Sequence, residues 1–279
     1  MSLMKIILLY NIIITSVLFI IIIALYFFII PIIHENNCKK RVYNDLIDKA
    51  STAEKSVIGI ISKSDINKLA SFSGIGSGVI FEKKENTYYA VTAAHVVDNK
   101  DNSYIIFTRN TEFKGKTVYL DEKSLTTFEI PDDEYYESLL KGKIEYISES
   151  DDLAIISFET EEDLPILEFE NNKIQKGNRI ISIGHPEGER YIKTYGKITS
   201  ELKSVNIPSK TSKDKIDRVI EHNCYLNFGN SGGVAISENM KIEGINIGGQ
   251  FTLTKKYSKG YMIPYNIVKE NIDKWQAEK

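Results

Sequence analysis

The sequence predicts an all-β domain, built as an antiparallel sandwich or as barrels, between an apolar N-terminal helix and a C-terminal helix. Three features of the chain indicate this arrangement. Residues 6–33 contain no charged residue and no histidine. About a dozen short runs rich in Val, Ile, Tyr and Phe follow, separated by turns rich in Gly, Asn, Asp and Lys. Residues 264–277 then return to a helical spacing of apolar residues.

The apolar run from Ile6 to Ile33 is long enough to cross a bilayer, which takes roughly 20 apolar residues in a helix. A cleaved signal peptide would have an apolar region of about 7 to 15 residues followed by a small-residue cleavage site. Here the run instead continues into Pro31. We therefore expect a tail over 1–5, an uncleaved membrane anchor over 6–33 that contacts the lipid bilayer, and a juxtamembrane stalk over 34–55.

The composition of the remaining chain is that of an ordinary globular protein. The 35 Lys and Arg residues and 38 Asp and Glu residues give a formal net charge of −3, which offers no electrostatic reason to expect nucleic acid as a partner. Cys38 and Cys224 lie far apart and match no metal-binding motif. Two free thiols, no metal and no cofactor are expected.

The predicted strands are short and lie between turn residues. They cover 56–62, 76–82, 87–92, 103–108, 116–120, 143–147, 153–158, 179–183, 193–199, 218–226, 233–237, 242–247 and 260–263. An acidic segment over 121–140 interrupts this rhythm and is expected to be a solvated surface insertion. The final helix starts near Pro264 and carries Ile267, Val268, Ile272 and Trp275 on one face.

The strongest local motif is Gly229-Asn230-Ser231-Gly232-Gly233. A serine hydroxyl is a poor nucleophile unless a base removes its proton, and acyl transfer also needs donors aimed at the developing oxyanion. Glycines on both sides of Ser231 allow a tight turn that exposes the hydroxyl and brings the N–H groups of Gly229 and Ser231 to one point. Taken alone, the same residues could form an ordinary hairpin turn.

Two further residues could complete a nucleophilic site. His95 follows the predicted strand that ends at Thr92, and an imidazole with a reference pKa of about 6.5 can accept a hydroxyl proton and later return it. Asp152 immediately precedes a predicted buried strand, where a carboxylate can orient the histidine; Asp151 is one residue farther from that strand and fits less well. Each signal alone is weak, because histidines and acids are common at strand ends.

Their order along the chain strengthens the interpretation. His95, Asp152 and Ser231 follow the order of chymotrypsin-like double barrels, not that of α/β-hydrolases or subtilisins. The chain resembles trypsin-like serine proteases of the high-temperature-requirement (Htr/Deg) type over about 56–271. The matching segments are Gly76–Ile80, Thr92–Val97, Asp152–Ala154, Leu164–Leu167, Ile183–Gly188, Gly196–Ser200, Gly229–Gly233, Gly244–Asn246 and Gly260–Pro264.

The resemblance implies two six-stranded antiparallel β-barrels. The first would cover 56–160, with His95 and Asp152, and the second 161–263, with Ser231, before a C-terminal helix over 264–279. A PDZ domain does not fit into the residues after Pro264, so regulation by such a module is not expected.

Several positions depart from the family pattern. Phe228 and Val234 stand where prolines are usual, and His185 replaces an asparagine. None of the three is one of the predicted catalytic residues, so these changes concern the shape of the loops. Asn230 stands where proteases activated by amino-terminal cleavage have an aspartate, so we expect no zymogen cleavage.

These residues together predict a membrane-anchored serine endopeptidase acting in protein quality control or regulated proteolysis. Ser231 would attack the peptide carbonyl, His95 would act as base and then acid, and Asp152 would orient His95. The Gly229 and Ser231 N–H groups would stabilise the oxyanion.

The partners would be polypeptide substrates. They would bind as an added strand beside Ile247, Gly248, Gly249 and Gln250. By analogy with the family, Tyr225 would lie near the base of the primary specificity pocket and favour small or medium apolar residues over Lys or Arg.

Two questions stay open. The alternative function is a catalytically silent, membrane-tethered protease-like domain that binds peptides or partners; a generic β-rich adaptor would require all three motifs to be coincidental. The side of the membrane is also undecided. Basic residues after the apolar run favour a cytoplasmic domain by the positive-inside rule, whereas the resemblance favours the extracytoplasmic side, which we give the greater weight.

Overall fold

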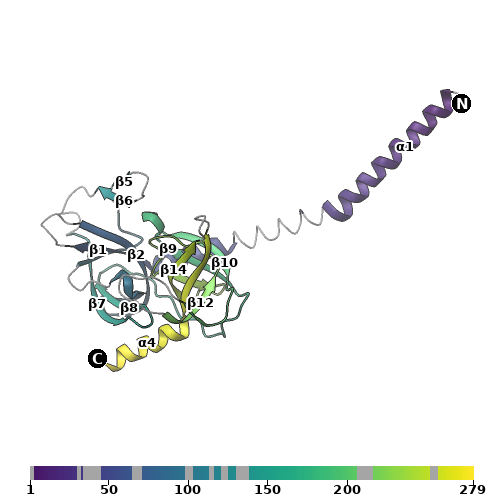
Figure 1. Ribbon diagram of the computed structural model, residues 1–279. Helices are drawn as coiled ribbons and strands as arrows, with labels where there is room; N and C mark the ends of the chain where they lie inside the picture. The colour runs from purple at the N-terminus through teal and green to yellow at the C-terminus, as the bar shows by residue number, and fades with distance from the viewer. Residues whose placement is uncertain are drawn as a thin grey trace. The chain divides into compact units, whose positions relative to one another are not determined.

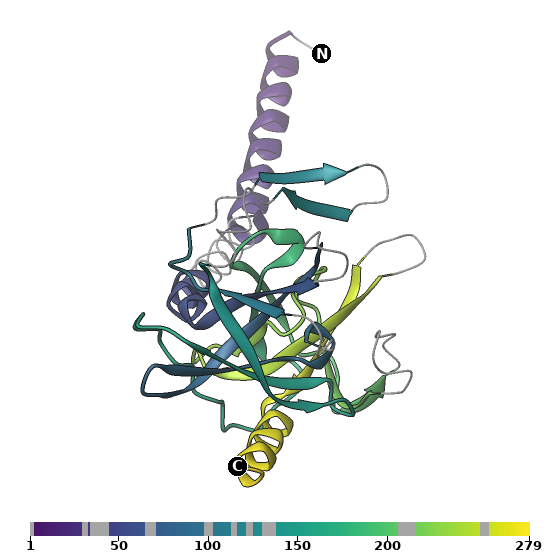
Figure 2. The same ribbon diagram turned by 90° about the vertical axis from the view of Figure 1, so that its left-hand side faces the viewer.

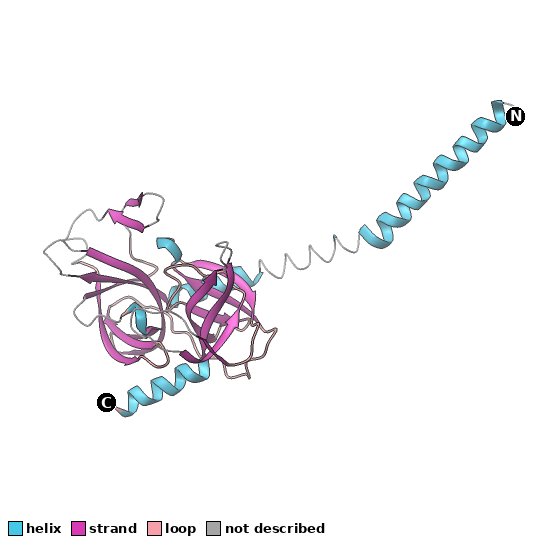
Figure 3. Cartoon of the chain, in the orientation of Figure 1, coloured by secondary structure: helices cyan, strands magenta, loops and turns pink. Residues whose placement is uncertain are grey.

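The computed structural model describes residues 3–29, 33, 45–64, 71–97, 103–112, 116–120, 125–129, 138–205, 216–251 and 257–279. The chain divides into two compact units, Met1–Leu46 and Ile47–Lys279. Figure 1 labels their elements, and Figure 3 shows that strands dominate the second unit, as the all-β prediction requires.

The first unit contains the helix α1 (Leu3–Ala24), which passes into one π-helical turn, η1 (Leu25–Ile29). Large apolar side chains such as Phe19 and Tyr26 are exposed. The predicted anchor over 6–33 is therefore not one regular helix, since the α-helical hydrogen bonding stops at Ala24. Among the residues described, no helix is both long and apolar enough to cross a membrane. Most of the predicted stalk, 34–44, lies outside the described residues.

Six strands of the second unit form a closed antiparallel barrel in the order β1-β2-β3-β8-β7-β4. Branched side chains such as Ile58, Ile80, Ile106 and Ile156 are fully buried and fill its interior, as expected of small barrels. The prediction of a first six-stranded barrel is confirmed. Its strands are β1 (Val57–Ser64), β2 (Ser71–Lys84), β3 (Thr87–Ala93), β4 (Ser103–Phe107), β7 (Leu140–Ser148) and β8 (Leu153–Glu159).

The predicted acidic insertion over 121–140 is not wholly without regular structure. Residues 125–129 form β6 (Leu125–Glu129), which pairs with β5 (Lys116–Leu120) in a separate two-stranded sheet (Figure 2). Leu140 already belongs to β7. Residues 121–124 and 130–137 lie outside the described part of the chain.

The second half differs from the predicted six-stranded barrel. It is a seven-stranded sheet in the order β10-β9-β13-β14-β15-β12-β11. One isolated bridge, between Ile198 and His222, joins the end of β10 to β12. The sheet does not close into a barrel, because the edge of β12 that would pair with β10 is occupied by β11, through Lys203 and Val205. The strands are β9 (Arg179–Gly184), β10 (Ile192–Lys197), β11 (Lys203–Val205), β12 (Ile216–His222), β13 (Val234–Ser237), β14 (Ile242–Phe251) and β15 (Tyr257–Pro264).

The predicted C-terminal helix is confirmed as α4 (Tyr265–Ala277). Its apolar face is buried, and Trp275 packs against the rings of Phe81 and Tyr89, with centroids 6.2 and 5.1 Å away. The helix contacts β7 and β8 of the barrel as well as β14 and β15 of the second sheet. It therefore links the two halves of the domain.

Candidate active site

Two paired strands of the barrel bring His95 and Asp152 together. β3 and β8 are antiparallel, with Ala93 opposite Leu153. The last residue of β3 therefore faces the first residue of β8. His95 lies on the short 3-10 turn η4 (Ala94–Val96) just after β3, and Asp152 lies just before β8. The pairing of β3 with β8 therefore brings His95 and Asp152 near each other.

The contact between these two residues is close and nearly buried. His95 Nδ1 lies 2.7 Å from Asp152 Oδ2, and the main-chain N–H of His95 donates to Oδ1 at 3.0 Å. Asp152 is 3% exposed. A carboxylate can only accept, so Nδ1 carries the proton of this bond and a neutral His95 keeps a free lone pair on Nε2. Asp151, the less favoured candidate, does not make this contact.

Asp152 has an uncommon backbone conformation. Its φ is +49°, in the left-handed region that residues with a side chain mostly avoid. A main-chain hydrogen bond helps to hold this unfavourable φ, because the carbonyl oxygen of Asp152 accepts the N–H of Ala94 at 3.0 Å. Strained residues of this kind persist where the surrounding structure over-determines them, and they cluster at functional sites.

The turn that carries Ser231 is packed against the strands that lead to His95. The carbonyl oxygen of Ser231 accepts the N–H of Ser77 at 2.8 Å. Gly232 has φ +79°, and a Cβ there would lie 2.0 Å from the carbonyl oxygen of Ser77 and 2.2 Å from Thr92 Oγ1. Only glycine permits this approach. The hydrogen bonds of His95 in the described part of the chain go to Asp152, not to Ser231.

Two main-chain donors in the turn are free. The N–H groups of Gly229 and Ser231 donate to no acceptor among the described residues, whereas the N–H groups of Asn230, Gly232 and Gly233 are all bonded. The carbonyl oxygen of Phe228 accepts the N–H of Glu187 at 2.7 Å. Because the C=O and N–H of a trans peptide point in opposite directions, this bond turns the N–H of Gly229 away from Glu187.

Two residues with no role predicted from the sequence, Ser77 and His185, form a hydrogen-bonded support for this turn. Ser77 Oγ lies 2.8 Å from the carbonyl oxygen of Gly229, and it also accepts the main-chain N–H of His185 at 3.1 Å. His185 Nδ1 is 3.1 Å from the same hydroxyl. Ser77 has one proton and gives it to the carbonyl oxygen, so His185 Nδ1 must be the donor in the remaining bond.

His185 is well suited to this duty because it stays neutral. Burial, with a smaller effect from Arg190, lowers the pKa of His185 to about 3. Its ring packs against the ring of Tyr191, with the two centroids 4.7 Å apart. The sequence signals were present, since Ser77 lies in a family-like segment and His185 departs from the family pattern, but neither signal reveals the contact.

The predicted substrate-binding residues lie before and after residues 229–233 in the sequence. Tyr225 is 47% exposed, and its ring lies 4.9 Å from that of Tyr257. Ile247 is buried, while Gly248 and Gly249 pair with Tyr261 and Gly260 of β15. Nearby in sequence, Phe228 is 86% exposed.

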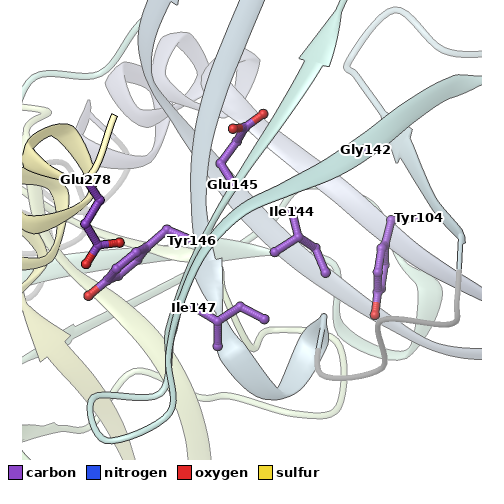
Figure 4. A pocket seen from close by; sticks show the side chains of 7 residues that line it. All are labelled: Tyr104, Gly142, Ile144, Glu145, Tyr146, Ile147 and Glu278. Atoms are coloured by element: carbon purple, nitrogen blue, oxygen red, sulfur yellow. The ribbon is translucent and has the colours of Figure 1, made fainter.

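The remaining candidate features are a metal site, the two cysteines and a cavity. Among the described residues, no group of three or more His, Cys, Asp or Glu side chains could hold a metal ion. Cys224 is a buried free thiol whose pKa burial raises to about 12, and Cys38 lies outside the described residues. A cavity of about 700 Å³ contains none of the predicted site residues. Figure 4 shows its lining, which is Tyr104, Gly142, Ile144, Glu145, Tyr146, Ile147 and Glu278.

Comparison with known proteins is consistent with this arrangement. Residues 76–245 match the family model of the trypsin-like peptidase domain, a stretch that includes His95, Asp152 and Ser231. A protein described as "Serine protease HtrA-like" from Staphylococcus aureus strain MRSA252 is 24% identical over 255 residues, which cover 87% of this chain and 29% of that protein. The protein of the same description from strain USA300 is 25% identical over 247 residues, covering 84% and 28%. The chain thus spans less than a third of these relatives.

Proposed function

Because the chain belongs to the trypsin-like peptidase family, we propose that it is a serine endopeptidase with His95, Asp152 and Ser231 as its catalytic triad. The observation that carries this proposal is the double hydrogen bond between His95 and the buried Asp152. A histidine held in this way has one nitrogen oriented and the other free to accept a proton. The similarity to serine proteases described as HtrA-like supports the same reaction.

The reaction would proceed through an acyl-enzyme. His95 Nε2 takes the proton of Ser231 Oγ as the oxygen attacks the peptide carbonyl, and the positive charge formed on the imidazole is stabilised by Asp152. The oxyanion accepts hydrogen bonds from the free N–H groups of Gly229 and Ser231. His95 then returns the proton to the leaving amine, and water releases the acyl group by the same steps in reverse.

Substrates would be extended polypeptides lying beside β14 near Gly248 and Gly249, where the absence of side chains allows the main chains to approach closely. Tyr225 and Tyr257 offer aromatic surface for the residue before the scissile bond. This surface favours small or medium apolar residues. Protein quality control or regulated proteolysis is the proposed role.

We also propose that residues 6–33 attach the enzyme to a membrane with the protease domain on the extracytoplasmic side. The support is the uncharged, apolar composition of this run. The test is extraction of membranes with carbonate, followed by protease treatment of intact and permeabilised cells. Recovery of the whole chain in the soluble fraction contradicts attachment. Protection of the domain in intact cells, with digestion only after permeabilisation, contradicts the extracytoplasmic side and leaves attachment and catalysis unaffected.

The catalytic proposal is tested with a fluorophosphonate probe and with casein. The chain is expected to be labelled at one serine and to cleave casein, and Ser231→Ala should abolish both. Ser204→Ala, at an exposed position of β11, is the matched control and should react normally. A wild-type chain that folds but is never labelled supports the alternative, a catalytically silent peptide-binding domain.

A further inference from the structure

The acid next to the proposed catalytic aspartate is also buried, and it has its own partners. Asp151 is 4% exposed. Its Oδ1 and Oδ2 accept Arg218 Nη2 at 2.9 and 3.0 Å. Oδ2 also accepts Asn271 Nδ2 at 3.0 Å, and Ser148 Oγ lies 3.5 Å away. Asp151 is therefore bound by residues other than His95, and two of them, Arg218 and Asn271, come from distant parts of the chain.

Two of these partners come from outside the barrel. Arg218 belongs to β12 of the second sheet, and Asn271 belongs to α4, which contacts both halves. Helix α4 contacts β8 of the barrel, and the ion pair between Arg218 and Glu270 joins it to β12. The Asp151 contacts thus connect the turn before β8 to two elements outside the barrel.

The partners are themselves held in place. Asn271 is 2% exposed; its Nδ2 also donates to the carbonyl oxygen of Ile267 at 2.9 Å, and its Oδ1 accepts Tyr146 Oη at 3.3 Å. Both amide protons of Asn271 are therefore used. Arg218 Nη1 donates to Glu270 Oε2 at 2.6 Å. Asp151 and Asn271 are buried, whereas Arg218 is partly exposed and Glu270 is exposed. The buried hydrogen bonds of Asp151 and Asn271 restrain the groups that they join.

Two consecutive carboxylates are consequently anchored to different parts of the domain. Asp152 binds His95, and Asp151 binds Arg218 and Asn271, so the turn that carries both has little freedom to rotate. This matters because Asp152 has the unfavourable φ of +49°, from which an unrestrained turn would relax. Arg218 also neutralises a charge that would otherwise lie unpaired beside Asp152.

We propose that Asp151, Arg218 and Asn271 form a positioning cluster that holds Asp152 in hydrogen-bonding geometry with His95. The three residues touch no substrate, and they act through Asp152. Helix α4 contributes to this positioning through Asn271, which binds Asp151. The inference rests on the proposed triad.

The test compares Asp151→Asn with Glu270→Gln. Asp151→Asn keeps the shape of the side chain but replaces one acceptor oxygen with a donor that faces Arg218 or Asn271. We expect kcat for a peptide substrate to fall about tenfold or more, since small displacements of catalytic groups have effects of this size, while KM changes by less than about twofold. Glu270→Gln removes a carboxylate from the same Arg218 on the exposed side and should leave kcat within about twofold of wild type.

A second readout does not need activity. Proton NMR reports the His95 Nδ1–H that is bonded to Asp152, and Asp151→Asn should shift or broaden this signal at temperatures where the variant is fully folded. Glu270→Gln should not change it. Asn271→Ala, which removes one donor to Asp151, serves if Asp151→Asn does not fold; it should lower kcat about threefold or more and alter the same resonance.

The outcomes separate the two proposals. If the wild type is not labelled by the fluorophosphonate probe, the proposed function fails, and the NMR signal still decides whether Asp151 positions Asp152. If the wild type is active and the folded Asp151→Asn variant has wild-type kcat and an unchanged His95 resonance, the positioning role is refuted. A lower thermal midpoint with both of these unchanged has the same meaning, because the cluster would then only stabilise the fold.

Discussion

The hydroxyl of Ser77 donates a 2.8 Å hydrogen bond to the carbonyl oxygen of Gly229. Ser77 belongs to the barrel, whereas Gly229 belongs to the turn that carries Ser231 in the other half. The N–H of Gly229 is one of the two donors proposed for the oxyanion. A residue of the first half thus helps to orient the turn that carries Ser231 of the proposed site in the second half.

Replacing Ser77 with Ala should therefore impair catalysis more than substrate binding. The change leaves the Gly229 carbonyl and two His185 donors without their partner in a buried place, at a cost of about 1–3 kcal/mol for such a group. We expect kcat to fall about tenfold with KM nearly unchanged, measured with a fluorogenic peptide. Ser204→Ala is the control. An unchanged kcat in the folded variant would mean that the turn holds its shape without Ser77.

Acid should destabilise the protein through two buried histidines. Burial lowers the pKa of His185 to about 3 and that of His222 to about 4, whereas a histidine in the unfolded chain titrates near 6.5. The unfolded state therefore binds more protons below about pH 6.5, and stability falls as the pH decreases toward 4. At pH 4.5 each histidine contributes a loss of up to about 3 kcal/mol.

Chemical denaturation between pH 7.5 and 4.5 measures this effect. His185→Asn, which introduces the residue usual in the family, should reduce the dependence of stability on pH whatever it does to the absolute value. Equal pH dependence in the wild type and the variant would show that His185 is protonated equally in the folded and unfolded states.

Glu243 should have the opposite pH dependence. Burial, and next the neighbouring carboxylate of Glu170, raise the pKa of Glu243 to about 7. The folded state thus holds a proton that the unfolded state has lost above about pH 4.5, so stability decreases as the pH rises through 7. Glu243→Gln should stabilise the protein at pH 8 by about 1–3 kcal/mol relative to wild type, with less effect at pH 5.

Denaturant melts at the two pH values test this difference. Glu168→Gln is a suitable control, because the Glu168 carboxylate is exposed and pairs with Lys241 at the surface. A Glu243→Gln gain that is the same at pH 5 and pH 8 would contradict a titration of Glu243 in this range.

Specificity should respond to the residue at position 225. Tyr225→Asp replaces a half-exposed ring with an acid, which can pair with a basic side chain of the substrate. We expect the ratio of kcat/KM for Arg over Leu before the scissile bond to rise about tenfold, measured with matched fluorogenic peptides. Tyr225→Asn removes the ring without adding charge, so it should not change this preference toward Arg. A ratio that is unaffected by Tyr225→Asp would place the pocket elsewhere.

The proposed site should form without cleavage of the amino terminus. Asn230 is 4% exposed, and its Oδ1 would lie 2.5 Å from a Cβ at Gly184. An amide cannot form an ion pair with a new terminal amine as an aspartate would. The intact chain should therefore react with the fluorophosphonate probe as fast as an amino-terminally clipped one, compared on the same gel. Reaction of the clipped form alone would overturn this expectation.

Much of the fold follows from local patterns in the sequence. Branched and aromatic residues at alternate positions predict the strands, and the helical spacing from Ile267 to Trp275 predicts α4. The meeting of His95 and Asp152 also follows once β3 and β8 pair, because each residue lies at the adjoining end of its strand. Local patterns in the sequence therefore determined the strands, the last helix and the identities of the candidate residues, whereas the six-stranded barrel was implied by the family resemblance.

The tertiary structure decided what holds those residues in place. Ser77 and Gly229 are 152 positions apart, and Asp151 and Asn271 are 120 apart. No periodicity or short motif relates residues at such separations, because their contact depends on how two sheets and a helix pack. The incomplete closure of the second sheet has the same origin, since pairing of β11 with β12 competes for one strand edge. Local preferences specify the elements, whereas hydrogen bonds between distant elements form only when those elements pack together, and they are stronger where packing excludes water.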